Sequence, residues 1–309
     1  MTYAAVIPTL NHYKKLPDII ADIRAIGLEV VIIDDGSDTT AGQKIASLAT
    51  DDGAVTVLRH ARNQGKGAAV LEGFRAVFAK GHSHAIQIDA DGQHDLNALA
   101  GMIALSRDNP DALIIGVPDY DQSIPLSRRI GRWVTHVWVW IETLSLALSD
   151  TMCGFRVYPL AATIDLMDQQ CIGKGMDFDT DIAVKLVWRG VPVVESAVAV
   201  TYPPNSHSNF RVFQDNLLIS WMHTRLFFTM LATLPSVLKN RPKVIKPTRH
   251  WSVLSERGVY TGLYFLTAVV KLLGRRACRY ALYPIITYFW LTGRESRQAS
   301  FDYLGRVLE

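Results

Sequence analysis

The chain has 309 residues, of which 49% are hydrophobic, and this is enough for one full α/β domain with an appendage. Its formal net charge of +3 is too mild to indicate a nucleic-acid partner, so we expect none. The three cysteines are far apart and include no C-x-x-C pair, which argues against a zinc site and against a disulfide framework.

The apolar runs of the chain bear on its location. The N-terminal residues show neither a basic stretch nor a cleavable apolar run, so we expect no signal peptide. No apolar run reaches the roughly 18 to 20 residues of a transmembrane helix. We therefore expect a cytoplasmic protein that contacts the inner-membrane surface through shorter aromatic helices.

The first half of the chain alternates strand and helix patterns. Short apolar runs predict strands, and apolar positions spaced three or four residues apart predict helices. The predicted strands are 4–8, 30–33, 55–58, 85–88 and 113–115, and the predicted helices are 15–26, 42–49, 66–80 and 96–106. This alternation predicts a Rossmann-like α/β fold, with a mainly parallel sheet and helices on both faces.

The second half is less regular. Helical patterns run over 125–148, 160–169, 177–189 and 210–238, the last expected to end at Pro235 or just after, and a strand is predicted over 191–202. The basic, proline-containing stretch 239–249 predicts a linker, and two or three helices follow it. We therefore divide the chain into a sheet domain at 1–210, a long helix with a basic linker at 211–249, and a helical segment at 250–309.

Polar side chains follow three of the predicted strands. The first strand ends in Pro8, Thr9 and Asn11, the second in residues 34–37, and the fourth in residues 89–93. Parallel α/β sheets bind ligands at the carboxyl ends of their strands. These polar side chains are therefore expected to line one cleft.

Asp89 and Asp91 form a D-x-D pair around Ala90. Two carboxylates at a strand end suit a hard divalent cation such as Mg²⁺ or Mn²⁺, which can bridge phosphate oxygens and help a diphosphate to leave. A D-x-D pair alone is more often a solvated acidic turn. The polar clusters at two other strand ends favour the metal site here.

The cluster at the second strand end can receive a nucleoside. Asp34 and Asp35 can accept hydrogen bonds from a base or a ribose, and Gly36 lets the backbone approach closely. Ser37 or Asp38 could also cap the following helix, and the two roles are compatible.

The glycine-rich stretch 62–69 opens a helix and contains Asn63, Lys66 and Gly67. Helix N-terminal amides and the charge of Lys66 favour an anion. The glycine and lysine spacing is not that of a P-loop. An ordinary loop and helix start fits this stretch equally well.

Five motifs follow one another in the order of a known family. They are Ile7-Pro8-Thr9-Leu10-Asn11, Ile33-Asp34-Asp35-Gly36-Ser37, Arg62-Asn63-Gln64-Gly65-Lys66-Gly67, Asp89-Ala90-Asp91-Gly92-Gln93-His94 and Cys153-Gly154-Phe155-Arg156-Val157-Tyr158. Over roughly residues 1–210 this series resembles family 2 glycosyltransferases of the GT-A fold, in particular those of the dolichol-phosphate mannosyltransferase type.

The resemblance implies an inverting, metal-assisted transfer of a sugar from a UDP- or GDP-linked donor to a lipid-linked or membrane-associated acceptor, such as polyprenyl phosphate or a glycolipid hydroxyl. It implies that Asp35 contacts the base, that Asp89 lies near the ribose and phosphates, and that Asp91 and Gln93 hold the metal. The residues implied to line the base or ribose are Pro8, Thr9 and Asn11.

Two departures from the family pattern concern the acceptor more than the donor. The family often has a glutamate after the asparagine of the first motif, where this chain has His12. The polyprenol-phosphate enzymes often have an arginine just after the fifth strand, which this chain lacks. Arg128, Arg129 or Arg132 is therefore the expected anion contact.

An inverting transfer to a hydroxyl needs a base, whereas a phosphate acceptor is already ionised. Asp179 or Asp181, in the acidic segment 177–181, is the expected base. An acidic start is also favourable for any helix, so this segment alone does not demand catalysis. Arg156 is expected to contact acceptor or phosphate anions, unless it pairs with a nearby aspartate.

The segment 250–309 resembles a different family. Its stretches 256–258, 273–276 and 297–304 resemble the beginning of bacterial lipid A acyltransferases, whose H-x-x-x-x-D motif comes further downstream. The resemblance implies a truncated N-terminal piece without acyltransferase activity, and the alternative is a helical cap on the first domain. The basic linker and aromatic helices suit an anionic inner leaflet.

Two other functions would use similar features. A nucleotidyltransferase-like enzyme would also combine a metal with a Rossmann-like half, but it would show a glycine-rich loop with a lysine near its start, which 8–15 lacks. A non-catalytic nucleotide-sugar-binding protein could keep Asp35 and lose the metal site. The presence of Asp89, Asp91 and Gln93 argues against it.

Overall fold

The computed structural model describes residues 1–119, 126–200, 211–240, 244–245 and 283. The chain divides into two units, Met1–Pro247 and Thr248–Glu309. The predicted helical segment 250–309, with its likeness to an acyltransferase, lies outside the described residues except for Tyr283. The description below concerns the first unit.

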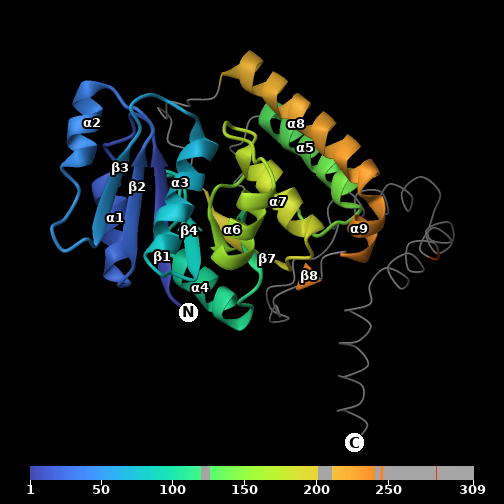
Figure 1. Cartoon of the computed structure of the whole chain (residues 1–309), viewed down its shortest axis with the longest axis horizontal. Coiled ribbons are helices and arrows are strands. Elements are labelled where there is room, and N and C mark those ends of the chain that lie inside the picture. The colour runs from blue at the N-terminus through green and yellow to red at the C-terminus, as the bar shows by residue number, and fades with distance from the viewer. Residues whose placement is uncertain (120–125, 201–210, 241–243, 246–282, 284–309) are drawn as a thin grey trace, which may run out of the picture. The chain divides into compact units, whose positions relative to one another are not determined.

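One sheet runs through the described part of the chain (Figure 1). Its strands are β1 (Tyr3–Thr9), β2 (Glu29–Asp34), β3 (Val55–Arg59), β4 (His84–Gln87), β5 (Leu113–Asp119), β6 (Arg156–Pro159), β7 (Val193–Ala199) and β8 (Val244–Ile245). They are arranged in the order β3-β2-β1-β4-β6-β5-β7-β8. Only β6 is antiparallel to its neighbours, so the predicted α/β class with a mainly parallel sheet is confirmed.

Helices cover both faces of this sheet, as predicted. They are α1 (Leu16–Ala25), α2 (Thr39–Ala46), α3 (Lys66–Ala79), α4 (Ala98–Asp108), α5 (Leu126–Thr143), α6 (Leu160–Gln169), α7 (Phe178–Trp188), α8 (Val212–Ala232) and α9 (Leu234–Lys239). The apolar sides of α1, α2 and α4 share one hydrophobic core, and those of α3, α6 and α7 share the other.

The central strands contribute side chains to both cores because successive side chains of a strand point to opposite faces of the sheet. Val6 of β1 and Val31 of β2 lie in the core under α3, whereas Ile7 and Ile32 lie in the core under α1. All four side chains are fully buried. This two-sided burial is why the strands read as unbroken apolar runs rather than as an alternation.

The strand β6 has no counterpart in the sequence prediction. β6 has only four residues, Arg156–Pro159, and begins with a charged side chain, so it lacks the apolar run that marks the other central strands. It pairs antiparallel between β4 and β5. The short strand is held by its two neighbours rather than by its own sequence pattern.

The stretch predicted as one helix over 210–238 is helical in its described part, but it contains two helices rather than one. α8 ends at Ala232, and α9 begins at Leu234 with Pro235 in its first turn. Proline has no N–H to donate and favours the first turn of a helix, so it starts a new helix here. β8 lies within the predicted linker and pairs in parallel with β7.

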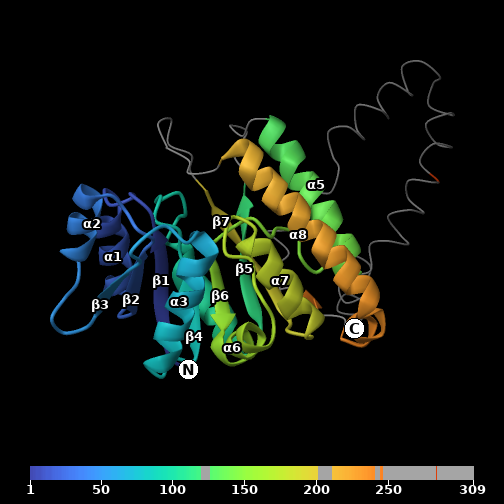
Figure 2. The same cartoon turned by 45° about the horizontal axis from the view of Figure 1, so that its top comes forward.

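α8 lies alongside α5 in both views of the molecule, on the outer side of α7 (Figures 1 and 2). The helix α8 and the strand β8 therefore belong to the same unit as the sheet domain. Of the helices in the described ranges, none combines the length and the hydrophobicity needed to cross a membrane.

The contact between α3 and β1 leaves no room for a side chain at Gly73. A Cβ atom there would lie 2.3 Å from Cγ1 of the buried Val6. We expect Gly73→Ala to lower the free energy of unfolding by about 1–2 kcal/mol, because overpacking outweighs the gain in helix propensity. Urea unfolding followed by circular dichroism measures this change.

Gly101 of α4 supplies the matched control. A Cβ atom there would meet nothing within 4 Å, and Gly101 is also inside a helix. Gly101→Ala is expected to raise the free energy of unfolding by up to about 1 kcal/mol. Equal effects of the two substitutions would contradict the packing of α3 on β1.

Candidate functional site

The candidate site lies where the strand order reverses. From β1 the chain continues to β2 and β3 on one side, whereas β4 lies on the other side of β1. In open α/β sheets the ligand crevice is at the carboxyl ends of the strands beside such a switch point. The segment 89–91 follows β4 and Asn11 follows β1, so these two predicted clusters share this edge of the sheet.

Lys66, at the start of α3, joins two carboxylates from distant segments. Its Nζ lies 2.8 Å from Asp89 Oδ1 and 2.8 Å from Asp179 Oδ2. Burial alone would lower the pKa of Lys66, but the charges of Asp179 and Asp89 raise it above its ordinary value. Burial alone would raise the pKa of Asp89, but Lys66 holds it below its ordinary value. The cluster therefore places one ammonium between the carboxyl groups of Asp89 and Asp179.

Asp179 is held from its other side by residues that sequence reasoning did not single out. Gln87 Nε2 donates to Asp179 Oδ1 at 2.8 Å, and the Tyr158 hydroxyl donates to Gln87 Oε1 at 3.2 Å. All three side chains are buried. The sequence feature that could have indicated this contact is Gln87 itself, because it is a polar residue inside the apolar run of β4. The two hydrogen bonds from Tyr158 to Gln87 and from Gln87 to Asp179 fix the position of the Asp179 carboxylate.

Asp91 is the candidate metal ligand beside Asp89. Its Oδ1 accepts a hydrogen bond from Gln93 N at 3.0 Å. Burial, followed by the charge of Asp89, raises the pKa of Asp91 above its ordinary value. A divalent cation would relieve this repulsion, and carboxylate oxygens are the donors that Mg²⁺ and Mn²⁺ prefer, so the residues fit such an ion.

The rest of a coordination shell does not come from further acidic, histidine or cysteine side chains. In the described ranges, no group of three or more such residues is gathered closely enough to hold a metal. Mg²⁺ in nucleotide sites usually keeps waters and phosphate oxygens beside one or two carboxylates. Gln93 Oε1 is the additional protein oxygen that sequence analysis assigned to this site.

Asp35 anchors the loop that leads into α3. Its Oδ1 accepts from Gln64 N and its Oδ2 accepts from Gly65 N, both at 2.8 Å. The His60 ring lies between Asp35 and Glu72, with Nδ1 2.6 Å from Asp35 Oδ1. Burial alone would lower the pKa of His60, but its bonds to these two carboxylates raise it. Asp35 is thus a loop anchor as well as the predicted base contact.

Gly36 explains why this loop can approach so closely. A Cβ atom on Gly36 would lie 2.6 Å from Asn63 N, and the residue has a φ of 76°. Both the space and the backbone angle therefore exclude most other residues. Asn63 itself is exposed, and its predicted ligand contact stays a prediction.

The side chains of Asp34, Ser37 and Asn11 bind other parts of the protein. Ser37 N donates to Asp34 Oδ1 at 2.9 Å, and Asn11 N donates to Ser37 Oγ at 2.8 Å. Asn11 Oδ1 accepts from Asp38 N at 2.9 Å. Asp38 caps α2 through Ala41 N, which is one of the two capping alternatives. These bonds hold the ends of β1 and β2 together.

The other residues predicted to bind the nucleotide sugar differ in their burial and contacts. Pro8 and Thr9 are buried, and Thr9 Oγ1 donates to His12 O at 3.1 Å. The Ala90 side chain is part of a hydrophobic core, so only its backbone faces outward. A Cβ atom on Gly67 would lie 2.5 Å from Gly173 O. Gly67 therefore serves the packing of α3 against the segment before α7.

Arg156 is fully buried, and its recorded partners are the protein's own oxygen atoms. The guanidinium donates to the carbonyl oxygens of Cys153, Thr151 and Asp179 at 2.8, 2.7 and 2.6 Å. Contact with a bound anion would require these bonds to break. The geometry favours a role in holding α7 against β6 over the predicted contact with acceptor or phosphate.

The two candidate bases occupy different environments. Asp181 is fully buried and binds Lys185 at 2.8 Å and Arg225 at 3.1 Å, and its Oδ2 also accepts from Gly173 N. Of the two candidate bases, Asp179 is the one that pairs with Lys66, next to Asp89. A helix turn of 3.6 residues separates positions 179 and 181 by about 200°, so one faces the site and the other faces α8.

Of the three arginines expected to replace the family arginine, the side chain of Arg132 alone is described. Arg132 Nε donates to Asp150 Oδ2 at 3.1 Å, and Asp150 Oδ1 accepts from Met152 N and Cys153 N. The side chains of Arg128 and Arg129 lie outside the described ones. Arg132 is therefore tied to the loop before β6 in this structure.

Gly154 is a further residue that the geometry adds to the site. A Cβ atom there would lie 2.4 Å from Asp89 Oδ2, so the carboxylate rests directly on the glycine. Gly154 belongs to the fifth sequence motif, but nothing in the sequence pairs it with Asp89. The antiparallel pairing of β6 with β4 brings the two together.

Comparison with known proteins places the chain beside sugar-transferring enzymes. The model of the family described as glycosyl transferase family 2 matches residues 4–161. An undecaprenyl-phosphate mannosyltransferase of Micrococcus luteus is 30% identical over 209 residues, which are 65% of this chain and 84% of that protein. A polyprenol monophosphomannose synthase of Mycolicibacterium smegmatis is 26% identical over 213 residues, 63% of this chain and 76% of that protein.

Among solved structures, a mannosyltransferase from Pyrobaculum calidifontis in complex with GDP-Man and Mn²⁺ aligns with a TM-score of 0.47. It is 14% identical, and the alignment covers 94% of this chain and 87% of that one.

Removing the Lys66 ammonium should change both stability and its dependence on pH. Lys66→Met leaves Asp89 and Asp179 as neighbouring carboxylates without their cation, so we expect a loss of about 1–3 kcal/mol at pH 7. Their pKa values then rise in the folded state, and the loss shrinks as pH falls toward 5. Urea unfolding at both pH values measures this.

In the wild type, by contrast, the stabilising contribution of Asp89 should decrease as pH falls. The lowered pKa of Asp89 means that its stabilising contribution is present above the unfolded pKa of about 4 and is lost as pH falls below it. Lys66→Arg keeps the charge and serves as control. A Lys66→Met protein as stable as wild type at pH 7 would rule out the bridge.

Proposed function

This chain belongs to glycosyl transferase family 2, and from that premise we propose that it is an inverting, metal-assisted glycosyltransferase using a nucleotide-diphosphate sugar and a lipid-linked acceptor. The observation that carries the proposal is the bridge from Asp89 through Lys66 to Asp179 at the switch point of the sheet. It joins the donor half of the predicted site to the acceptor half through one charged side chain.

The donor half consists of Asp35, Asp89 and Asp91 at two strand ends. We assign the base to the Asp35 side and the diphosphate to the D-x-D side, because Asp91 and Gln93 supply hard oxygen donors. When bound, Mg²⁺ or Mn²⁺ would supply positive charge that offsets the charge developing on the departing nucleoside diphosphate. The lowered pKa of Asp89 keeps that carboxylate ionised at neutral pH.

The acceptor half centres on Asp179. Its carboxylate is oriented by Gln87 at 2.8 Å and by Lys66 at 2.8 Å, and this fixed position supports its assignment to the acceptor beside the diphosphate. A hydroxyl acceptor would pass its proton to Asp179 as it attacks. A phosphate acceptor is already ionised, and Asp179 would then position it through Lys66.

The acceptor class is inferred from relatives. The similar proteins of Micrococcus luteus and Mycolicibacterium smegmatis are named an undecaprenyl-phosphate mannosyltransferase and a polyprenol monophosphomannose synthase. We therefore infer a polyprenyl phosphate as acceptor, with a UDP- or GDP-linked sugar as donor, at the cytoplasmic face of the membrane that holds this lipid.

Asp91→Asn tests the metal site. We expect isothermal calorimetry of the wild type to show at least about tenfold tighter GDP or UDP binding with Mn²⁺ than without it, a gain of about 1.4 kcal/mol. Asp91→Asn should lose this gain and lower transfer at least about 100-fold, a typical loss when a charge-stabilising group is removed.

Asp108→Asn, at the exposed end of α4, removes the same charge and should change neither quantity. Near-full activity of Asp91→Asn would refute the metal assignment. The nucleotide that binds also identifies the base of the donor.

Substitutions of the two candidate bases should have different effects, one on the reaction rate and the other on the free energy of unfolding. Asp179→Asn should lower kcat at least about 100-fold while the protein stays folded, because Lys66 keeps its bond to Asp89. Asp181→Asn should instead cost about 3–5 kcal/mol of unfolding free energy, because Lys185 and Arg225 lose a buried partner.

Single-turnover kinetics and urea unfolding distinguish these outcomes. A wild-type kcat for Asp179→Asn would remove Asp179 from the mechanism. With a hydroxyl acceptor the remaining rate of Asp179→Asn should rise with pH, and with a phosphate acceptor it should not, which identifies the acceptor chemistry.

A further inference from the structure

The ring of His60 lies between two carboxylates that come from different segments. Its Nδ1 is 2.6 Å from Asp35 Oδ1, and its Nε2 is 2.5 Å from Glu72 Oε2. A neutral imidazole carries one N–H, and its other nitrogen is an acceptor. With a neutral ring, one of the two ionised carboxylates would face a nitrogen lone pair. An imidazole is a stronger base than a carboxylate, so the ring holds the second proton and is an imidazolium.

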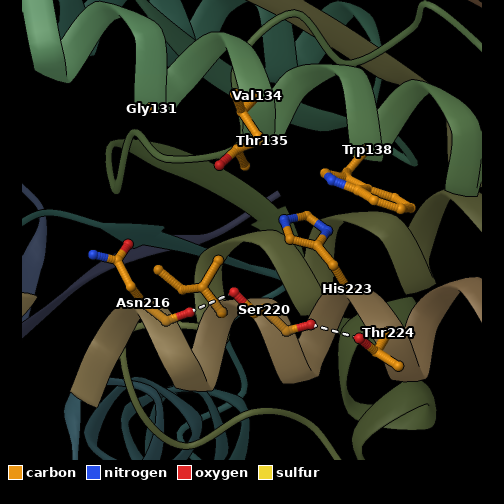
Figure 3. A pocket seen from close by; sticks show the side chains of 9 residues that line it. Gly131, Val134, Thr135, Trp138, Asn216, Ser220, His223 and Thr224 are labelled. Carbon is orange, nitrogen blue, oxygen red and sulfur yellow. Dashed lines mark hydrogen bonds between the residues drawn. The ribbon is translucent and has the colours of Figure 1, made fainter. Parts of the chain in front are cut away.

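A second buried histidine shows the difference. His223 Nδ1 lies 2.8 Å from Glu142 Oε1, and its Nε2 has no hydrogen-bond partner among the described residues. Figure 3 shows the His223 ring reaching from α8 toward α5, beside the Trp138 indole. A neutral ring with its proton on Nδ1 satisfies this arrangement. Of these two histidines, His60 is the one whose contacts require both N–H groups.

The burial of the three groups makes the charge of His60 important. His60 is 6% exposed and Asp35 is 3% exposed, whereas the Glu72 side chain is 47% exposed. Burying an ionised carboxylate without a compensating charge is costly. The imidazolium supplies that charge to Asp35, and Glu72 in turn stabilises the imidazolium from the surface of α3. Hydrogen bonds between charged groups of this kind are the stronger ones.

The basic side chains near His60 do not replace it. Arg59, which precedes it at the end of β3, has its Nε 3.4 Å from Asp34 Oδ2. Lys66 of α3 is paired within the candidate site. Arg62, in the loop that leads into α3, is exposed. The recorded charged partners of the ring are therefore the carboxylates on either side of it.

His60 determines which part of Asp35 is left for a ligand. An ionised carboxylate has about four acceptor positions. Asp35 Oδ1 accepts from His60 and from Gln64 N, and Oδ2 accepts from Gly65 N. The position that remains is on Oδ2. Because His60 and Gln64 N hold Oδ1, the carboxylate cannot turn without losing these bonds, and Oδ2 stays available to a bound nucleotide.

The same carboxylate places the start of α3. Gly65 precedes Lys66, the first residue of that helix, and has a φ of 103°. A Cβ atom on Gly65 would lie 2.3 Å from Lys174 O, so this turn is closely packed. The Asp35 bonds to Gln64 N and Gly65 N therefore connect the charge of His60 to the position of Lys66.

We propose that His60 is a positioning residue of the nucleotide site, which as an imidazolium held by Glu72 orients Asp35 and the loop into α3, so that nucleotide-sugar binding weakens when the ring loses its proton. The proposal rests on the proposed function, because it assumes a nucleotide sugar on the Asp35 side. Loss of the proton also adds one negative charge to a site that receives a diphosphate, so the affinity falls for a second reason.

The direction of the pH effect follows from the environment of His60. Burial alone would lower the pKa of His60, but its bonds to Asp35 and Glu72 raise it above the ordinary value of about 6.5. The imidazolium is therefore present at pH values below about 6.5 and is lost as pH rises through the raised pKa. Binding and protonation are linked, so a bound nucleotide sugar should move the titration of His60 to higher pH.

The charge state of His60 can be measured without a ligand. We expect the imidazole nitrogen signals of the full chain, labelled with ¹⁵N-histidine, to show His60 charged at about pH 6.5, with the assignment made by their loss in His60→Gln. Glu72→Gln should move the titration of His60 to lower pH, because one of its two carboxylates is lost. Asp108→Asn removes the same charge from an exposed site on α4 and should leave this titration unchanged.

Calorimetry with UDP-glucose and with GDP-mannose, in the presence of Mg²⁺, tests the effect on binding. We expect the Kd of the sugar nucleotide that binds to rise at least about tenfold as His60 loses its proton, and the His60 titration to move by the same factor in proton concentration when that nucleotide is added. Glu72→Gln should bind like wild type at low pH, and its Kd should rise at lower pH than in wild type. His60→Gln should bind at least about tenfold more weakly at low pH and lose this pH dependence.

Thermal unfolding at each pH establishes that the variants are folded. A His60 ring that is neutral at about pH 6.5 overturns the proposal. One pH profile of Kd shared by wild type, Glu72→Gln and His60→Gln also overturns it, even where His60→Gln binds more weakly, because His60 then has a structural role only. In either case sugar-nucleotide binding itself leaves the proposed function in place. A wild type that binds neither sugar nucleotide at any pH refutes the proposed function, and this role of His60 fails with it.

Discussion

The ammonium of Lys66 joins three parts of the chain that are far apart in the sequence. It lies 2.8 Å from Asp89, which follows β4, and 2.8 Å from Asp179, which is 113 residues further along the chain than Lys66. Without this cation, two carboxylates would face each other in a partly buried space and their charges would repel. The ion pairs of Lys66 therefore fix the start of α3, the D-x-D turn and the start of α7 relative to one another.

Most other acidic residues near this edge are already satisfied by the protein. Asp35 accepts from the backbone of the loop before α3, Asp34 accepts from Ser37 N, and Asp181 is paired with Lys185 and Arg225. Asp91 differs, because burial and Asp89 raise its pKa and its recorded bond is a local one from Gln93 N. An acidic group left in that state is suited to a ligand rather than to folding.

α7 connects the two halves of the molecule that matter for function. Its first turn carries Asp179 toward Lys66 and Asp181 toward Arg225 of α8. Arg156, fully buried under this turn, fixes it by binding Asp179 O and Thr151 O. A charged network of this kind is costly to rearrange once buried, so the candidate site and α8 keep a fixed relation.

The strands of the first half, the polar strand ends and the D-x-D pair could be predicted from sequence, because two-sided burial leaves apolar runs and ligand groups must follow them. β6 could not, since a four-residue strand beginning with arginine gains its stability from its neighbours. Sequence left Asp179 and Asp181 equivalent as candidate bases and assigned Arg156 to an anion. Only the packing of α7 between α3 and α8 turned one aspartate to Lys66 and the other to Arg225, because side-chain direction on a helix matters only once both neighbours are in place.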